Sequence, residues 1–425
     1  MISRRRFTRG ALASMASSAL LVPTAGRAAA STASQRKFLF IYASGGWDPT
    51  WVFAPVGEGS IAVGDPSGQT ATVGGLTYVS NETRGSVDTF FQSYGDRCCI
   101  INGLEIPSVT HERCRTLSFT GGSGTGLDDW PSILAGASTG FTLPHLVLSG
   151  PSFTSRYTAS VMRLGESSQL SALISGSALS RSDTPLSMLS QDSAALVETF
   201  VAARRQAWID AAGRGQARRH ADALGLSAEQ VELLQALQGD IELGVESKGW
   251  VYASDRVRPA LTCMERGFTR CALVEQAGEW NVTWDNHTNI SQMDAHYRTL
   301  FDDLLEIMAD VDSRTTVSGG RLADELTIVV FSEMGRTPTL NSGQGKDHWT
   351  CTSAMLIGAG VRGDQVVGAF DDQLLGRPID LSSGQASEHG TAITAQHLGA
   401  TLLALGDIDP GQWVGDVAPI EAALA

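Results

Sequence analysis

The sequence predicts an α/β protein with a mostly parallel central sheet, helices on both faces and a helical insertion. Runs such as Phe38–Ala43 and Leu326–Phe331 are apolar without polar alternation. Such runs are typical of strands that are buried on both faces of a parallel sheet. Charged and hydroxyl side chains recur directly after these runs, where parallel strands end and ligands bind in open α/β sheets.

The amino-terminal segment predicts export. Ser3–Phe7 reads SRRRF, which is the pattern of a twin-arginine signal, and an apolar run follows from Ala11 to Val22. Ala28–Ala30 provides the small residues of a cleavage site. We predict a signal peptide at 1–30, passage through the twin-arginine export machinery, a periplasmic or secreted protein, and no membrane span after cleavage.

Charge and cysteine content exclude some classes of partner and site. The chain has 45 acidic and 31 basic residues and a formal charge of -14, which argues against nucleic acid as a partner. Its six cysteines form no CxxC pair and no zinc-ribbon spacing. Buried free thiols are therefore expected, with a Cys263–Cys271 bridge as the alternative in an oxidising compartment.

The first half of the sheet presents two candidate site segments. The run Phe38–Ala43 leads to Ser44-Gly45-Gly46-Trp47-Asp48, which places Asp48 at a strand end. A surface excursion at 56–80 and a short helix at Val87–Tyr94 precede a second strand, Cys98–Asn102. That strand leads to a segment with hydroxyl groups, an imidazole and a carboxylate, which contains Ser108, Thr110, His111 and Glu112.

Residues 185–245 predict the helical insertion. Three stretches there, 194–210, 217–224 and 228–243, combine helical periodicity with mixed charge. We interpret these charges as a solvated face.

The second half of the chain adds further strand ends. A strand at Cys271–Glu275 precedes Asp285 and His287, and a long helix is expected at Ser291–Asp312. Glu333 directly follows the run Leu326–Phe331. A loop then leads to Asp347 and His348, a further apolar strand, Thr352–Gly358, and a helix, Thr391–Leu405.

Carboxylates and imidazoles from separate strand ends predict a divalent metal site. Zn²⁺ accepts such nitrogen and oxygen ligands and Mn²⁺ accepts an oxygen-rich version of the set, while Ca²⁺ or Mg²⁺ are the alternatives. Asp285 and His287 can share one ion, and Asp48 and Glu333 can bridge to or hold a second. The hydroxyl of Thr110 or Ser108 is the candidate for a metal-activated nucleophile.

Four motifs in order, GGWD, WDNH, SEMGRTP and GKDHW, resemble those of the twin-arginine-exported family called domain of unknown function 1501. That family is similar to the alkaline-phosphatase/sulfatase superfamily. The resemblance implies an alkaline-phosphatase-like domain over 31–425 that includes the insertion. It also implies metal ligands at Asp48, Asp285, His287, Glu333 and His348, and catalytic groups at Thr110 and His111. Asp347, which directly precedes His348 in the loop after the Glu333 strand, is a further candidate ligand.

One position departs from the superfamily pattern. Met334 follows Glu333, where the superfamily has the histidine of an Asp-His pair, so one ligand of a second metal is missing. Two hypotheses follow. The first is an exported metal-dependent hydrolase that acts on a phosphate or sulfate ester of a small molecule, or on another anionic substrate. The second is a non-catalytic exported protein that retains the fold and one structural metal, and acts in binding or surface assembly.

Overall fold

The computed structural model describes residues 35–138, 140–163, 190–212, 252–279 and 282–425, together with residues 215, 218, 222 and 225. The predicted signal peptide at 1–30 lies outside the described residues and remains a prediction. No helix in the described ranges is long and apolar enough to cross a membrane.

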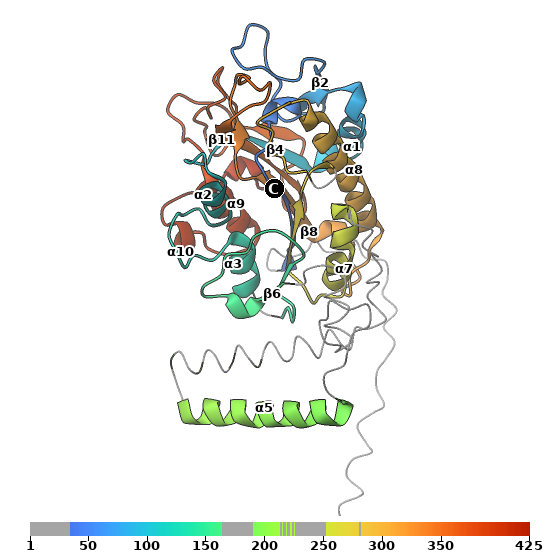
Figure 1. Cartoon of the computed structure of the whole chain (residues 1–425), viewed down its shortest axis with the longest axis vertical. Helices are drawn as coiled ribbons and strands as arrows, with labels where there is room; N and C mark the ends of the chain where they lie inside the picture. The colour runs from blue at the N-terminus through green and yellow to red at the C-terminus, as the bar shows by residue number, and fades with distance from the viewer. Residues whose placement is uncertain are drawn as a thin grey trace, which may run out of the picture. The chain divides into compact units, whose positions relative to one another are not determined.

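The predicted α/β fold is confirmed: a mostly parallel sheet of eight strands forms the centre of the protein (Figure 1). The strands lie in the order β12-β4-β11-β8-β1-β7-β5-β6, and only β11 runs opposite to its neighbours. The strands are β1 Lys37–Ala43, β4 Cys98–Glu105, β5 His145–Val147, β6 Val161–Arg163, β7 Cys271–Gln276, β8 Leu326–Ser332, β11 Cys351–Gly358 and β12 Gln365–Val367.

The strand β1 lies in the middle of the sheet because its side chains are apolar on both faces. It pairs in parallel with β8 on one side and with β7 on the other, and all seven of its residues are buried. Continuous burial explains why the run shows no polar alternation. The parallel pairing brings the residues that follow β1, β7 and β8 to one edge of the sheet.

Helices cover both faces of the sheet (Figure 1). Leu39 and Ile41 of β1 belong to one apolar core with residues of α1, α7 and α8. Phe38 and Phe40, which point to the other face, belong to a second core with residues of α2, α3 and α9. The helices are α1 Ser86–Tyr94, α2 His111–Thr120, α3 Trp130–Gly136, α7 Ala253–Glu265, α8 Gln292–Ser313, α9 Ala395–Leu405 and the short α10 Gly411–Val414.

The stretch 56–80, expected as a surface excursion, contains an ordered hairpin of β2 Gln69–Val73 and β3 Leu76–Ser80. The two-residue connection is Gly74-Gly75, a sequence that favours a tight hairpin turn. A short antiparallel pair, β9 Gly335–Arg336 and β10 His348–Trp349, lies beyond β8 and bears on the site.

Within the predicted insertion, the structure describes the helix α5 Gln191–Ala212. The expected helix at 228–243, and most of the one at 217–224, lie outside the described residues. All six cysteines are free and buried. The expectation of buried free thiols is confirmed, and the alternative Cys263–Cys271 bridge is not formed.

Candidate functional site

The carboxylate of Glu333 lies at the end of β8 and is fully buried. Its two oxygens accept the backbone N–H of Gly45, at 3.0 and 3.1 Å. Gly45 adopts a φ of +124°, and a Cβ there would lie 2.5 Å from Thr283 Oγ1. Gly45, the first glycine of the GGWD motif, is therefore needed for this close approach of the backbone.

His111, the first residue of α2, lies between two carboxylates. Its Nδ1 is 3.0 Å from Glu333 Oε1, and its Nε2 is 3.2 Å from Asp285 Oδ2. Hydrogen bonds to Asp285, and then to Glu333, raise the pKa of His111 to about 9. In the absence of a metal ion, the imidazole is therefore a cation between two anions at neutral pH.

Asp285 is the residue on which the site converges. It follows β7, and its Oδ1 lies 3.1 Å from His348 Nε2 and 2.7 Å from Arg336 Nη2. Burial raises the pKa of Asp285, but the side chains of His111, His348 and Arg336 around its two oxygens outweigh burial and hold the pKa far below its usual range. Asp285 is therefore ionised throughout the physiological pH range.

Two further imidazoles meet at the same carboxylate oxygen. His287 Nε2 lies 2.9 Å from His348 Nε2 and 3.1 Å from Asp285 Oδ1. The opposite nitrogen of each ring faces an acceptor: His348 Nδ1 lies 2.7 Å from the Val109 carbonyl, and His287 Nδ1 lies 3.0 Å from Asp347 Oδ1. Each Nδ1 therefore carries the proton in the neutral ring, and each Nε2 presents a lone pair.

Three of these residues, His111, Asp285 and His348, form a group that could hold a metal ion, because their ligand atoms lie within 4.8 Å of one another. Ligand bonds of about 2.0–2.2 Å place neighbouring ligand atoms roughly 3–3.5 Å apart, and the contacts of His111 and His348 with Asp285 are 3.2 and 3.1 Å. The donor set is nitrogen and oxygen, which suits Zn²⁺ or Mn²⁺.

The charge of the surroundings also fits a divalent cation. Asp285, Glu333 and Asp347 contribute three carboxylates, and Arg336 contributes one guanidinium. A metal bound at Nε2 requires neutral imidazoles, that of His111 included, and two negative charges then remain for the metal to compensate. Carboxylates held this closely repel one another unless a cation or protons compensate them.

The structure does not bring Asp48 into this cluster. Asp48 is fully buried, and its Oδ2 forms an ion pair with Lys346 Nζ at 2.6 Å. Its Oδ1 accepts the N–H and the hydroxyl of Thr50, at 3.1 and 2.7 Å. Both carboxylate oxygens of Asp48 therefore have protein partners, which argues against a role for Asp48 in the same cation site.

The predicted nucleophile, Thr110, lies beside the cluster. It is the N-cap residue of α2, and it lies between Val109, whose carbonyl holds His348, and His111. The Thr110 side chain is exposed, and its hydroxyl lies 3.4 Å from the Ser108 hydroxyl. The chain therefore places both candidate hydroxyls at the same edge as the imidazoles.

Sequence reasoning missed the two cations that organise this edge. Arg336 is fully buried, and its guanidinium donates to the carbonyls of Gly45, Gly46, Trp284 and Lys346 as well as to Asp285. The available signal was the position of Arg336 and Lys346 inside the SEMGRTP and GKDHW motifs.

The other described histidines lie outside the cluster. His145 is buried, with Nδ1 3.2 Å from the Cys271 carbonyl, and His296 accepts the N–H of Glu279. His397 completes a capping box at the start of α9. His389 is exposed in a loop, and His220 lies outside the described residues.

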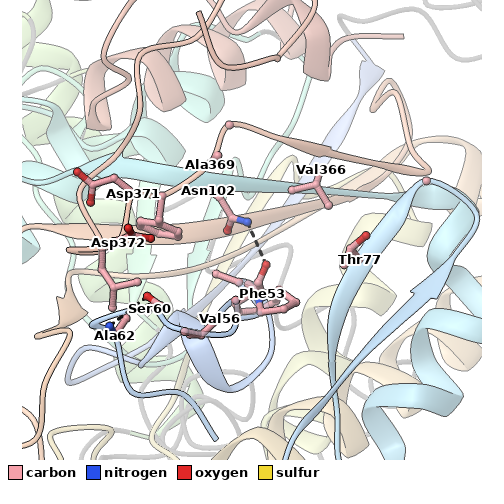
Figure 2. A pocket seen from close by; sticks show the side chains of 17 residues that line it. Phe53, Val56, Ser60, Ala62, Thr77, Asn102, Val366, Ala369, Asp371 and Asp372 are labelled. Carbon is pink, nitrogen blue, oxygen red and sulfur yellow. Dashed lines mark hydrogen bonds between the residues drawn. The ribbon is translucent and has the colours of Figure 1, made fainter.

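A separate cavity of about 320 Å³ opens near β2 and β3 (Figure 2). Its lining includes Asn102, whose amide donates to the Phe53 carbonyl at 2.9 Å, and Asp371 and Asp372 lie at one side. None of the predicted site residues lines this cavity.

A comparison with known protein families agrees with the motifs. The family described as "Protein of unknown function (DUF1501)" matches residues 36–417. Among solved structures, one match is BT4656 in complex with its substrate D-glucosamine-2-N,6-O-disulfate, at 9% identity and a TM-score of 0.34, covering 92% of this chain and 80% of that one. No curated protein gives a significant match.

Proposed function

The chain belongs to the DUF1501 family of proteins of unknown function, and we propose that it is an exported hydrolase that binds one divalent cation. Zn²⁺ and Mn²⁺ suit the donor set best. The substrate that we propose is a small phosphate or sulfate ester, since a cation at this edge would attract an anionic group.

The observation that carries the proposal is the contact between His287 Nε2, His348 Nε2 and Asp285 Oδ1, at 2.9 to 3.1 Å. The protons of both rings are committed to acceptors on the far side, so these three atoms face one another with lone pairs. Imidazoles fixed in this way by carboxylates and carbonyls are the usual surroundings of a bound transition metal.

Each side chain has a role that its contacts support. Glu333 and Val109 orient His111 and His348 through their Nδ1 atoms. Arg336 holds the carboxylate of Asp285. The Thr110 hydroxyl is available at the beginning of α2, as a nucleophile requires. A bound cation would lower the pKa of a nearby hydroxyl or water and neutralise an anionic substrate.

Metal analysis of protein purified after native export tests the proposal. We expect about one tightly bound Zn²⁺ or Mn²⁺ per chain and a lower melting temperature in a chelator, because a ligand that binds only the folded state stabilises it. His348→Ala should lose the metal and its response to chelator. His397→Ala is the control, since it removes a helix cap and should keep the metal.

A panel of phosphate and sulfate esters then tests catalysis, with Thr110→Val as the variant that lacks the hydroxyl. If wild-type protein carries no metal, and chelator leaves its melting temperature unchanged, the proposed metal centre is wrong.

A second function is supported by the environment of Asp48. Lys346 forms an ion pair with Asp48, a carboxylate that a second cation would need, and Met334 is buried where the superfamily pattern has a histidine. These features favour a protein that retains one metal for stability or partner binding. Stoichiometric metal with no hydrolysis across the ester panel would support this non-catalytic function.

Export is the remaining part of the proposal, and the SRRRF pattern supports it. Changing Arg4 and Arg5 to Lys together should leave the precursor in the cytoplasm. An unchanged yield in the periplasmic fraction would exclude the twin-arginine route.

A further inference from the structure

Four exposed aliphatic side chains lie on the segments that build the cluster: Val63, Val109, Val282 and Leu340. We call this set the apolar collar. The exposed fractions are 40%, 49%, 47% and 36% in that order. Outside α5, the described ranges expose only four other large apolar side chains to this extent: Ile61, Tyr252, Val317 and Leu375.

Hydrogen bonds connect two members of the apolar collar to site residues. The Val109 carbonyl accepts a hydrogen bond from His348 Nδ1 at 2.7 Å. The Val63 carbonyl accepts one from Lys346 Nζ at 2.7 Å, and the Val63 N–H donates to the Pro338 carbonyl at 2.7 Å. The positions of these two valines are therefore tied to the loops that carry the cluster.

The other two members are close to site residues in the chain. Val282 directly precedes Thr283, whose hydroxyl accepts the N–H of Asp285 at 2.9 Å. Leu340 directly precedes Asn341, whose amide donates at 3.0 Å to the His287 carbonyl and to Asp347 Oδ1. Four separate segments that carry or contact site residues thus each hold an exposed aliphatic residue.

Single exposed apolar residues are normal on a protein surface, but a group of them beside a polar centre marks a binding region. A ligand that gains from both features carries its charge at one end and apolar groups at the other. A small hydrophilic ester would leave the collar in water, whereas an alkyl or aromatic group would remove it from water.

We infer that the substrate is an ester of an apolar alcohol, with the phosphate or sulfate group at the cluster and an alkyl or aromatic group against the apolar collar. This inference rests on the proposed function, because the cluster must bind the anionic group. It specifies the chemical class of the alcohol part of the substrate.

The experiment measures the binding of three probes to the zinc-loaded full-length protein by calorimetry: inorganic phosphate, methyl phosphate and octyl phosphate below its micelle concentration. Octyl phosphate should bind at least about tenfold more tightly than methyl phosphate, because each buried methylene contributes to affinity. Leu340→Asn and Val282→Asn should each remove much of this difference and leave inorganic phosphate binding unchanged.

Val317→Asn is the matched control. Val317 is 71% exposed, and its N–H donates to the carbonyl of Glu265, the last residue of α7. This variant removes an exposed aliphatic side chain outside the apolar collar, so it should retain the full preference for octyl phosphate.

The possible failures are distinguishable. If wild-type protein binds neither zinc nor inorganic phosphate, the proposed function and this inference are both wrong. If zinc and phosphate bind but methyl and octyl phosphate bind equally, only the inference is wrong. It is also wrong if Leu340→Asn and Val282→Asn keep the octyl preference, or if they change only the sedimentation coefficient, which would make the collar an interface between copies of the chain.

Discussion

Asp48 follows β1 and Asp285 follows its parallel neighbour β7, so both carboxylates belong to the same edge of the sheet. Asp48 is fully buried and paired with the ammonium group of Lys346. Asp285 has a side chain that is 30% exposed, and imidazoles and a guanidinium surround it. Asp48 is sealed from solvent beside its one cation, whereas Asp285, although it also pairs with Arg336, stays accessible to an exchangeable cation.

The two carboxylates at this edge of the sheet therefore differ in role, one in stability and the other in function. Removal of one partner of a buried ion pair strongly destabilises a protein, because the other charge remains without water or a counter-charge. A partly exposed carboxylate among imidazoles can exchange protons and ions with solvent. We therefore expect changes at Asp48 and Lys346 to affect folding, and changes around Asp285 to affect metal binding.

The largest effect should come from Lys346→Met, which leaves the buried Asp48 carboxylate unpaired. We expect a loss of about 3–5 kcal/mol in the free energy of unfolding, measured by urea denaturation of the chelator-treated protein. Adding Asp48→Asn should recover most of this loss, because an amide needs no counter-charge. A loss below about 1 kcal/mol in the single variant would contradict the description of this pair.

The second largest effect is expected when the two carboxylates are neutralised in turn and compared. Asp285→Asn should abolish stoichiometric metal binding and the response of the melting temperature to chelator, because a central ligand charge is lost. At a free metal concentration of 100 Kd, that response corresponds to about 2.7 kcal/mol in the wild type. Asp48→Asn should be destabilised and still bind metal. Loss of metal in both variants would show that Asp48 belongs to the centre after all.

The sequence could predict which groups lie at this edge of the sheet, but not which of them serve stability and which serve metal binding. Unbroken apolar runs identified the strands, and parallel strands bring the groups that follow them together, so Asp285, Glu333 and His348 were predicted as neighbours. The partner of each charge could not be predicted, because Lys346 lies in a loop and Arg336 in the two-residue strand β9, and neither leaves a periodic pattern. The reversed direction of β11 was also invisible, since its apolar run resembles that of a parallel strand.

A smaller effect is expected from Glu333→Gln, which retains a hydrogen-bond acceptor for His111 but removes a buried charge behind it. Loss of such an outer partner typically weakens metal binding 10- to 100-fold, which competition with a zinc indicator would measure. Glu325→Gln is the control, because Glu325 pairs with Lys37 at the opposite end of β1. Equal zinc affinity in the Glu333→Gln variant and the wild type would exclude an orienting role for Glu333.

The smallest effect should come from Asp347→Asn, and its salt dependence makes it informative. The side chain of Asp347 is 59% exposed, and hydrogen bonds from His287 and then Asn341 lower its pKa. The amide oxygen of Asn can still accept the His287 N–H, so only a solvated charge is lost. We expect zinc affinity to fall less than about tenfold, since water and salt weaken interactions between exposed charges.

At 0.5 M salt, the difference between Asp347→Asn and the wild type should almost disappear, whereas the effect of Glu333→Gln should persist because Glu333 is fully buried. Zinc titrations of both variants at low and high salt would measure this contrast. If the Asp347→Asn effect is large and independent of salt, Asp347 does more than orient His287, and its predicted role as a direct metal ligand becomes the better explanation.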